Sequence, residues 1–78
     1  MYTVYSKLNC PHCDTIQKIF DHKNISYTKY VLEQDFTREE FISEFGEGST
    51  FPRVLDSSGT LIGGAKETVS YLRSEGIV

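Results

Sequence analysis

The spacing of hydrophobic and polar residues changes several times along the chain, and each change marks a predicted element. The segment YTVYS (2–6) is rich in β-branched and aromatic residues, which is typical of a strand. From Pro11 to about Lys23 the apolar residues recur at helical spacing, and a proline suits the first position of a helix. The segment ISYTKYVL (25–32) then predicts a second strand.

A second helix is predicted from the signals at its two ends. Thr37 and Glu40 have the spacing of a capping box, in which each side chain hydrogen-bonds to the backbone of the other residue. Gly46 is typical of the residue that ends a helix. We expect its inward-facing stripe to consist of Phe41, Ile42 and Phe45.

The rest of the chain predicts a hairpin and a last helix. Residues 54–56 and 60–62 are its short strands, and DSSG is typical of the turn between them. The helix runs from about Ala65 to Glu75, and Gly76 ends it. The predicted order is βαβαββα. We therefore expect an α/β fold with one domain over residues 1–78 and a sheet covered on both faces.

Composition and charge narrow the function classes. With 78 residues, 38% hydrophobic residues, five Phe and five Tyr, the chain can build one small core. Its formal net charge of −3 argues against a nucleic-acid-binding module, which needs a basic surface. The sequence has no run of about 18 apolar residues, and MYTVYSK lacks the basic and apolar regions of a secretory signal. We therefore expect a soluble cytoplasmic protein without membrane or nucleic-acid partners.

Cys10 and Cys13 are the residues that most directly indicate chemistry. A bond between them would close a loop too short to stabilise the fold much by restricting the unfolded chain. In a reducing compartment such a pair is more often catalytic or metal-binding than structural. The predicted helix places Cys10 at its N-cap, where backbone N–H groups and the helix dipole favour a thiolate. We therefore expect the pKa of Cys10 to lie below that of a free cysteine. Cys13 follows one turn later, more buried, within reach of a mixed disulfide on Cys10.

A zinc site is the main alternative for the cysteine pair. Tetrahedral zinc needs two further ligands, and the only histidines are His12 and His22, so we expect no metal. Pro11 stiffens the turn. His12 either adds positive charge near the sulfur and makes the disulfide more oxidising, or is an ordinary exposed residue.

Four segments, in this order, resemble the glutaredoxins of the thioredoxin-fold superfamily. YSKLNCPHC is similar to the family's strand and active-site segment, REEF to the start of its second helix, TFPRV to its cis-proline segment and GTLIGGAKE to its Gly-Gly motif. The resemblance implies a four-stranded mixed sheet flanked by three helices. It implies a glutathione-dependent oxidoreductase that reduces protein disulfides and glutathione mixed disulfides. Glutathione is its electron-donating co-substrate, no cofactor is tightly bound, and its role lies in electron transport and cell redox homeostasis.

The resemblance also implies roles for individual residues. It makes Cys10 the nucleophile and Cys13 the resolving thiol. The backbone of Phe51, before a cis Pro52, would pair with the cysteinyl part of glutathione like an added strand. The glutathione-binding residues that it implies are Lys7, Pro11, His12, Phe51, Pro52, Gly64, Lys66 and Glu67.

Charge complementarity agrees with these positions, since glutathione has two carboxylates and one ammonium group. The resemblance implies that Lys7 faces the glycine carboxylate. The γ-glutamyl end would lie at the N-terminus of the last helix, held by Gly64, Lys66 and Glu67. Arg38 is a further candidate cation. For each of these charges, ordinary exposure to solvent is the alternative interpretation.

Departures from the family pattern leave alternatives open. CPHC replaces the usual CPYC, Phe51 a common valine, Arg53 a frequent glutamine, and AKE a Ser/Thr-Asp pair. One alternative is a glutaredoxin-like protein reduced by thioredoxin reductase, although the WSGFRP-like segment of such proteins is absent. Another is a glutathione-bridged dimer that holds an iron–sulfur cluster, against which Pro11 argues. We expect a monomer whose clients are disulfide-containing or glutathionylated proteins, and ribonucleotide reductase is the client that the family most suggests.

Overall fold

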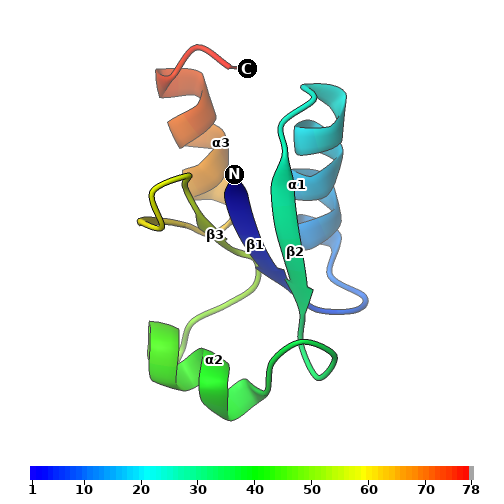
Figure 1. Cartoon of the computed structure of the whole chain (residues 1–78), viewed down its shortest axis with the longest axis vertical. Helices are drawn as coiled ribbons and strands as arrows, with labels where there is room; N and C mark the ends of the chain where they lie inside the picture. The colour runs from blue at the N-terminus through cyan, green and yellow to red at the C-terminus, as the bar shows by residue number, and fades with distance from the viewer. Residues whose placement is uncertain (78) are drawn as a thin grey trace.

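The computed structural model describes residues 1–77, and its strands and helices follow one another as the sequence predicts (Figure 1). The elements are β1 (Tyr2–Ser6), α1 (Pro11–His22), β2 (Tyr27–Val31), α2 (Arg38–Phe45), β3 (Arg53–Leu55), β4 (Leu61–Gly63) and α3 (Ala65–Ser74). The predicted βαβαββα order is therefore confirmed.

The strands form one mixed sheet in the order β2-β1-β3-β4. β1 and β2 are parallel, with Tyr5 opposite Tyr30, because the chain crosses over through α1 between them. β3 runs antiparallel to β1, with Val4 opposite Val54, and β4 runs antiparallel to β3. The expected four-stranded mixed sheet is confirmed.

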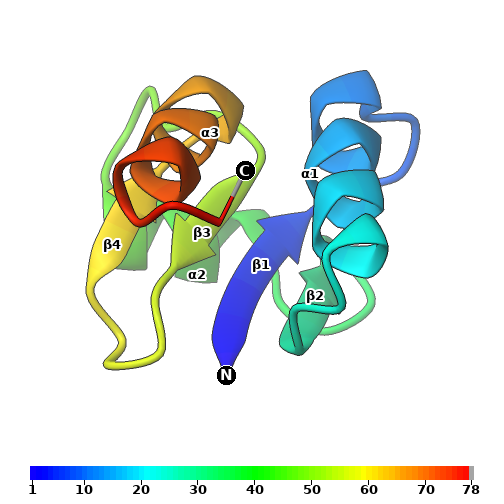
Figure 2. The ribbon, with the colours of Figure 1, turned by 90° about the horizontal axis from the view of Figure 1, so that it is seen from above.

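Two helices cover one face of this sheet, and the third contributes side chains to the other face. α1 and α3 lie side by side over one face, as Figure 2 shows. The fully buried residues between these helices and the sheet are Val4, Ile16, Phe20, Val54 and Leu72. α2 lies beyond the C-terminal ends of β1 and β2 (Figure 1), and its aromatic rings reach Tyr5 on the other face. Neighbouring strand residues point to opposite faces, so Val4 and Tyr5 separate the two layers.

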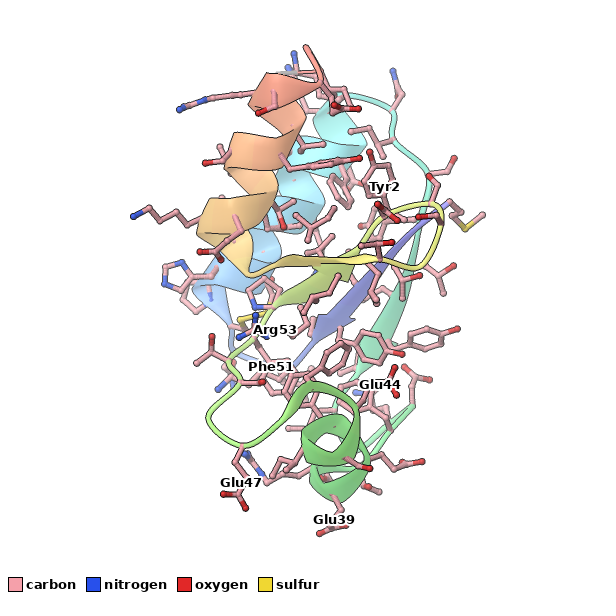
Figure 3. All side chains as sticks on the ribbon, turned by 90° about the vertical axis from the view of Figure 1, so that its left-hand side faces the viewer. Tyr2, Glu39, Glu44, Glu47, Phe51 and Arg53 are labelled. Atoms are coloured by element: carbon pink, nitrogen blue, oxygen red, sulfur yellow. A yellow bond between two sulfur atoms is a disulfide. The ribbon has the colours of Figure 1, made fainter. Side chains whose placement is uncertain are left out.

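Helix α2 begins and ends where its sequence signals predict. Glu40 N–H donates to the Thr37 hydroxyl at 3.2 Å, and Thr37 N–H donates to Glu40 Oε1 at 2.8 Å. Gly46 follows the helix, as expected. Phe41 is the buried residue of the inward-facing stripe, and Figure 3 shows Phe51 between this helix and the strands.

β2 is shorter at its start than the predicted strand 25–32. Ile25, which the prediction places in the strand, is instead bonded to the end of α1, because its N–H donates to Phe20 O at 2.8 Å. Asn24, between them, has a left-handed φ of 56°, which is typical of the residue that follows a helix. The chain can therefore enter β2 only from Tyr27 onward.

The hairpin strands are displaced by one residue from the predicted ones. Asp56 belongs to the turn, because its carboxylate accepts the N–H groups of Ser58 and Thr60 at 2.9 and 3.0 Å. β3 therefore ends at Leu55, one residue earlier than predicted. β4 begins at Leu61, one residue later than predicted.

Among residues 1–77, no helix is both long and apolar enough to cross a membrane.

Candidate active site

Cys10 lies at the junction between the loop after β1 and the first turn of α1. Its backbone is extended, with φ −117° and ψ 99°, as is usual for an N-cap residue, and Pro11 occupies the first helical position. Asn9 before it has a left-handed φ of 56°, which asparagine tolerates better than most residues. The predicted N-cap position of Cys10 is confirmed.

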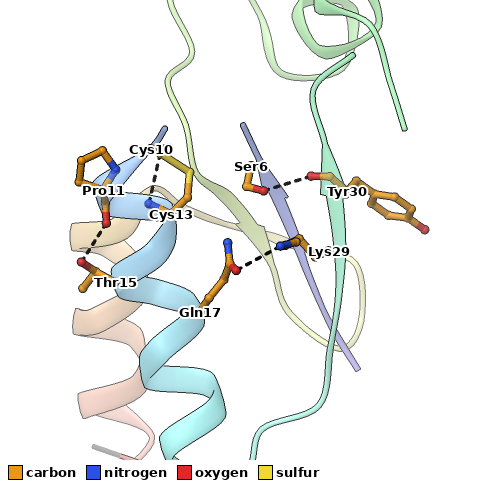
Figure 4. The surroundings of a disulfide bond; sticks show 8 residues. All are labelled: Ser6, Cys10, Pro11, Cys13, Thr15, Gln17, Lys29 and Tyr30. Carbon is orange, nitrogen blue, oxygen red and sulfur yellow. Dashed lines mark hydrogen bonds between the residues drawn. A yellow bond between two sulfur atoms is a disulfide. The ribbon is translucent and has the colours of Figure 1, made fainter. Parts of the chain in front are cut away.

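A disulfide joins Cys10 to Cys13, and their Cα atoms are 5.2 Å apart (Figure 4). Cys13 N–H donates to Cys10 Sγ at 3.2 Å, so a backbone donor at the helix N-terminus points at the sulfur. Such a donor stabilises a negatively charged sulfur more than a neutral one. The geometry therefore supplies what a thiolate at Cys10 requires.

The two cysteines differ in their access to solvent. Cys10 is 5% exposed and Cys13 is 0% exposed, in the expected order. Cys13 begins the buried stripe of α1, which continues with Ile16 and Phe20. An incoming disulfide therefore reaches the sulfur of Cys10 first, and Cys13 lies on the buried side of Cys10.

The other side chains of the first turn are open to solvent. Pro11 and His12 are both exposed, and Asp14 adds a negative charge in the same turn. Pro11 O accepts a hydrogen bond from the Thr15 hydroxyl at 3.0 Å (Figure 4). Solvent weakens the effect of exposed charges, so the backbone donor is the stronger influence on the sulfur.

A second part of the candidate site surrounds Phe51 and Pro52, just before β3. The peptide bond between them is cis, as the resemblance implies, and Pro52 is buried. The Phe51 ring stacks on Phe41 of α2, with centroids 4.3 Å apart and planes 21° apart. Lys7 Nζ lies 5.7 Å from the centroid of the Phe51 ring. The structure therefore brings Lys7 to the cis-proline segment.

Arg53 follows Pro52 and lies opposite Tyr5 in the sheet. Figure 3 shows it beside Phe51, between α2 and α3. Its Nε is buried and has no hydrogen-bond partner within residues 1–77. Buried guanidinium N–H groups usually have an acceptor, so the Arg53 Nε–H group is an exception among the described residues.

The N-terminus of α3 forms the third part of the site. Gly64 is the N-cap and donates its N–H to Glu67 Oε1 at 2.9 Å. A Cβ added to Gly64 would lie 3.5 Å from Pro52 O, so this helix end lies against the cis-proline segment. Lys66 and Glu67 are exposed, and so is Arg38 at the start of α2. The Glu67 carboxylate is therefore turned onto the backbone of its own helix.

Two residues support the site in ways that the sequence does not predict. Phe41 is predicted only as an inward-facing residue, and the sequence does not indicate that Phe51 rests on it. Thr68 is fully buried, and its hydroxyl donates to Gly64 O at 2.8 Å, which fixes the start of α3. A threonine on the inner side of a predicted helix was the available signal for this bond.

The arrangement suits chemistry between sulfur atoms. The described part of the chain, residues 1–77, holds no group of three or more His, Cys, Asp or Glu side chains placed to bind a metal ion. It places a backbone donor against the sulfur pair, and it places the cation of Lys7 beside the segment that contains the buried Pro52. These groups fit an anionic thiol or disulfide as the ligand.

Comparisons with known proteins identify relatives. Residues 2–58 match a protein-family model described as Glutaredoxin. The chain is 31% identical over 70 residues to glutaredoxin-2, mitochondrial, of Pongo abelii, and the match covers 83% of this chain but only 42% of that protein. A wheat glutaredoxin structure is 30% identical with a TM-score of 0.79, and covers 97% of this chain and 73% of its own. A buckwheat glutaredoxin–glutathione complex is 25% identical with a TM-score of 0.79, and covers 97% and 71%.

Proposed function

Because the chain belongs to the glutaredoxin family, we propose that it is a glutathione-dependent thiol–disulfide oxidoreductase that works through Cys10 and Cys13. The observation that carries this proposal is the position of Cys10 at the N-cap of α1, bonded to a more buried cysteine one turn later. This position gives one sulfur the character of a nucleophile and the other that of an internal reductant.

Removal of glutathione from a protein needs only Cys10. Its thiolate attacks the glutathione sulfur of the mixed disulfide, and the protein leaves as a thiolate that takes up a proton. Cys10 then carries the glutathione in a new disulfide. A second glutathione thiolate attacks that glutathione sulfur, which releases glutathione disulfide and restores the Cys10 thiolate.

Reduction of a protein disulfide needs both cysteines. Cys10 attacks one sulfur and forms a mixed disulfide with the protein. Cys13 loses its proton and attacks Cys10 Sγ, which releases the protein as a dithiol and leaves the Cys10–Cys13 disulfide. Two glutathione molecules then supply the two electrons that reopen this bond, and they leave as glutathione disulfide.

We place glutathione along the cis-proline segment and the N-terminus of α3. The Phe51 backbone would pair with its cysteinyl part, and Lys7 would attract its glycine carboxylate. Pro11 and His12 would border its sulfur, and Lys66 would attract the γ-glutamyl carboxylate. The nearness of Lys7 to Phe51 supports this placement.

Glu67 would have to move when glutathione binds in this way. Its carboxylate accepts from Gly64 N–H in the free protein. If it turned toward the ammonium group of glutathione, Gly64 N–H would become free to donate to the neighbouring carboxylate. The nearness of Gly64 to Pro52 supports a ligand that reaches both.

The clients of this activity would be disulfide-containing or glutathionylated proteins in a reducing, cytoplasmic compartment. Ribonucleotide reductase is one such client by analogy with the family. We propose that the protein acts as a monomer.

A coupled assay tests the proposal. A glutathionylated peptide is the substrate, and NADPH oxidation is followed with glutathione plus glutathione reductase, or with thioredoxin reductase alone. We expect turnover with glutathione and little with thioredoxin reductase. The opposite pattern would identify a thioredoxin-reductase-dependent protein instead. A coloured, iron-containing preparation without turnover would indicate a cluster-binding dimer.

A further inference from the structure

A hollow lies on the face of the sheet that α1 and α3 leave free. Its volume is about 310 Å³, and β1, β2, α2 and the loop before α2 line it. Its aromatic lining consists of Tyr5, Tyr30, Phe36, Phe41 and Phe45. Its carboxylates are those of Asp35, Glu40 and Glu44. No lysine or arginine is among these lining residues, so the hollow combines aromatic rings with negatively charged side chains.

Tyr5 is the centre of the aromatic lining. Its ring centroid lies 5.1 Å from Phe36 and 5.1 Å from Phe45, both edge-on, and 5.4 Å from Tyr30. Tyr30 is 39% exposed, so part of this cluster faces solvent. The faces of such rings carry partial negative charge and attract cations.

The three carboxylates are not equivalent. Asp35 Oδ2 accepts a hydrogen bond from Val31 N–H at 2.8 Å. Glu40 Oε1 accepts one from Thr37 N–H at 2.8 Å, so both carboxylates are already hydrogen-bonded to the backbone. Glu44 is exposed on α2 and makes no such backbone bond within the described residues. Burial raises the pKa of Tyr5, and the negative charge of Glu44 raises it further, which indicates that this carboxylate acts on the hollow.

We propose that this hollow binds the guanidinium or ammonium group of a basic side chain on the protein substrate. The inference rests on the proposed function, because the substrate is the one whose disulfide reaches Cys10. The cation would lie against the rings of Tyr5 and Tyr30, with Glu44 as its counter-ion.

Two features favour a substrate side chain as the occupant. The hollow is at the small end of ligand pockets, so it fits one long side chain rather than a larger molecule. The hollow also adjoins the cis-proline segment, along which glutathione is proposed to bind, because Phe41 both lines the hollow and stacks on Phe51 at 4.3 Å. A segment bound beside Phe51 can therefore place a neighbouring side chain in the hollow. Arg53 lies opposite Tyr5 in the sheet but is not among the lining residues.

Paired peptides test the proposal through turnover. Glutathionylated peptides would carry arginine at successive positions on either side of the cysteine, or citrulline, which has the same shape without the charge. We expect kcat/KM to favour arginine by roughly three- to tenfold at one or two positions. Glu44→Gln should reduce this preference to about twofold or less. Glu39→Gln removes the same charge from an exposed position of α2 outside the hollow and should keep the preference.

Binding without turnover separates this inference from the redox function. N-acetylarginine amide, titrated into the oxidised protein, should shift the ring proton signals of Tyr5 and Tyr30. The signals of Tyr27, which packs on Phe20 at the other face, should stay in place. Ring shifts in a protein that fails the coupled assay would support the hollow and refute the redox proposal. Equal turnover of arginine and citrulline peptides, equal effects of both Glu variants, or an absence of ring shifts would refute the cation site.

Discussion

Replacement of Phe41 by leucine should weaken glutathione binding without touching the cysteines. Phe41 is 4% exposed and stacks on Phe51, whose backbone is proposed to pair with glutathione. Its ring also lies 4.9 Å from Phe45 and 5.8 Å from Phe36. Leucine fills part of the space but provides no ring, so Phe51 loses the surface on which it rests.

The size of the effect follows from the contacts that are lost. Each aromatic pair contributes about 0.5–1.5 kcal/mol beyond its buried area, and a hydrophobic exchange of similar volume costs less than about 1.5 kcal/mol. Four pairs are lost, those with Tyr5, Phe36, Phe45 and Phe51, while leucine keeps much of the burial. Counting each pair near the lower end of that range, we expect a loss of about 2–3 kcal/mol in the free energy of unfolding. A domain of this length has a total of about 4–12 kcal/mol, so the variant should remain folded.

The functional effect should appear in binding rather than in chemistry. With Phe51 less well fixed, KM for the glutathionylated peptide should rise about three- to tenfold, and kcat should change less than twofold. Unfolding is followed by circular dichroism in urea, and kinetics by the coupled assay with glutathione reductase.

Phe20→Leu is the matched control. Phe20 is fully buried in the other layer, where its ring packs on Tyr2 and Tyr27 at 5.3 and 5.2 Å. It should lose comparable stability but keep its KM. If both variants raised KM equally, the effect would come from general loosening, and the reasoning about the Phe41–Phe51 stack would be refuted.

Three further predictions concern other parts of the molecule. Cys13→Ser should keep removal of glutathione from a mixed disulfide and Cys10→Ser should abolish it; complete loss in both variants would contradict the assigned roles. Hydrogen bonds, first that of Ser58, lower the pKa of Asp56, so its stabilisation is present above about pH 4 and lost as the pH falls through the lowered value. Thermal unfolding between pH 2 and 7 should therefore show Asp56→Asn less stable than the wild type near neutrality, with a difference that shrinks in acid; a constant difference would contradict this. Thr68→Val should cost about 1 kcal/mol in urea unfolding, because the bond to the start of α3 is lost, and an unchanged midpoint would disprove that bond's contribution.

Local signals in the sequence were sufficient for much of the fold. The capping box at Thr37 and Glu40 and the proline after Cys10 act within one turn of helix, so neighbouring residues determine them. The hairpin was misplaced by one residue because Asp56 bonds to the backbone of its own turn and leaves the strand. Similarly, the cap at α3 was missed because a glycine stands where such boxes usually have serine or threonine.

Contacts between distant segments could not be predicted in the same way. The stack of Phe51 on Phe41 depends on how α2 lies against the strands, which no local pattern encodes. The hollow around Tyr5 depends on the parallel pairing that brings Tyr30 beside it. The sequence shows that Tyr5 and Tyr30 are aromatic residues of predicted strands. Only the order of the strands in the sheet shows that their rings lie on the same face.

The acidity of the Cys10 thiol is the measurement that most directly tests the central claim. Thiolate absorbance near 240 nm, followed against pH in the Cys13→Ser variant, gives this pKa without interference from the second sulfur. We predict a midpoint clearly below the value of about 8.5 for a free cysteine, and a return to that value in the urea-unfolded protein. A midpoint in the folded protein at or above about 8.5 would contradict the account.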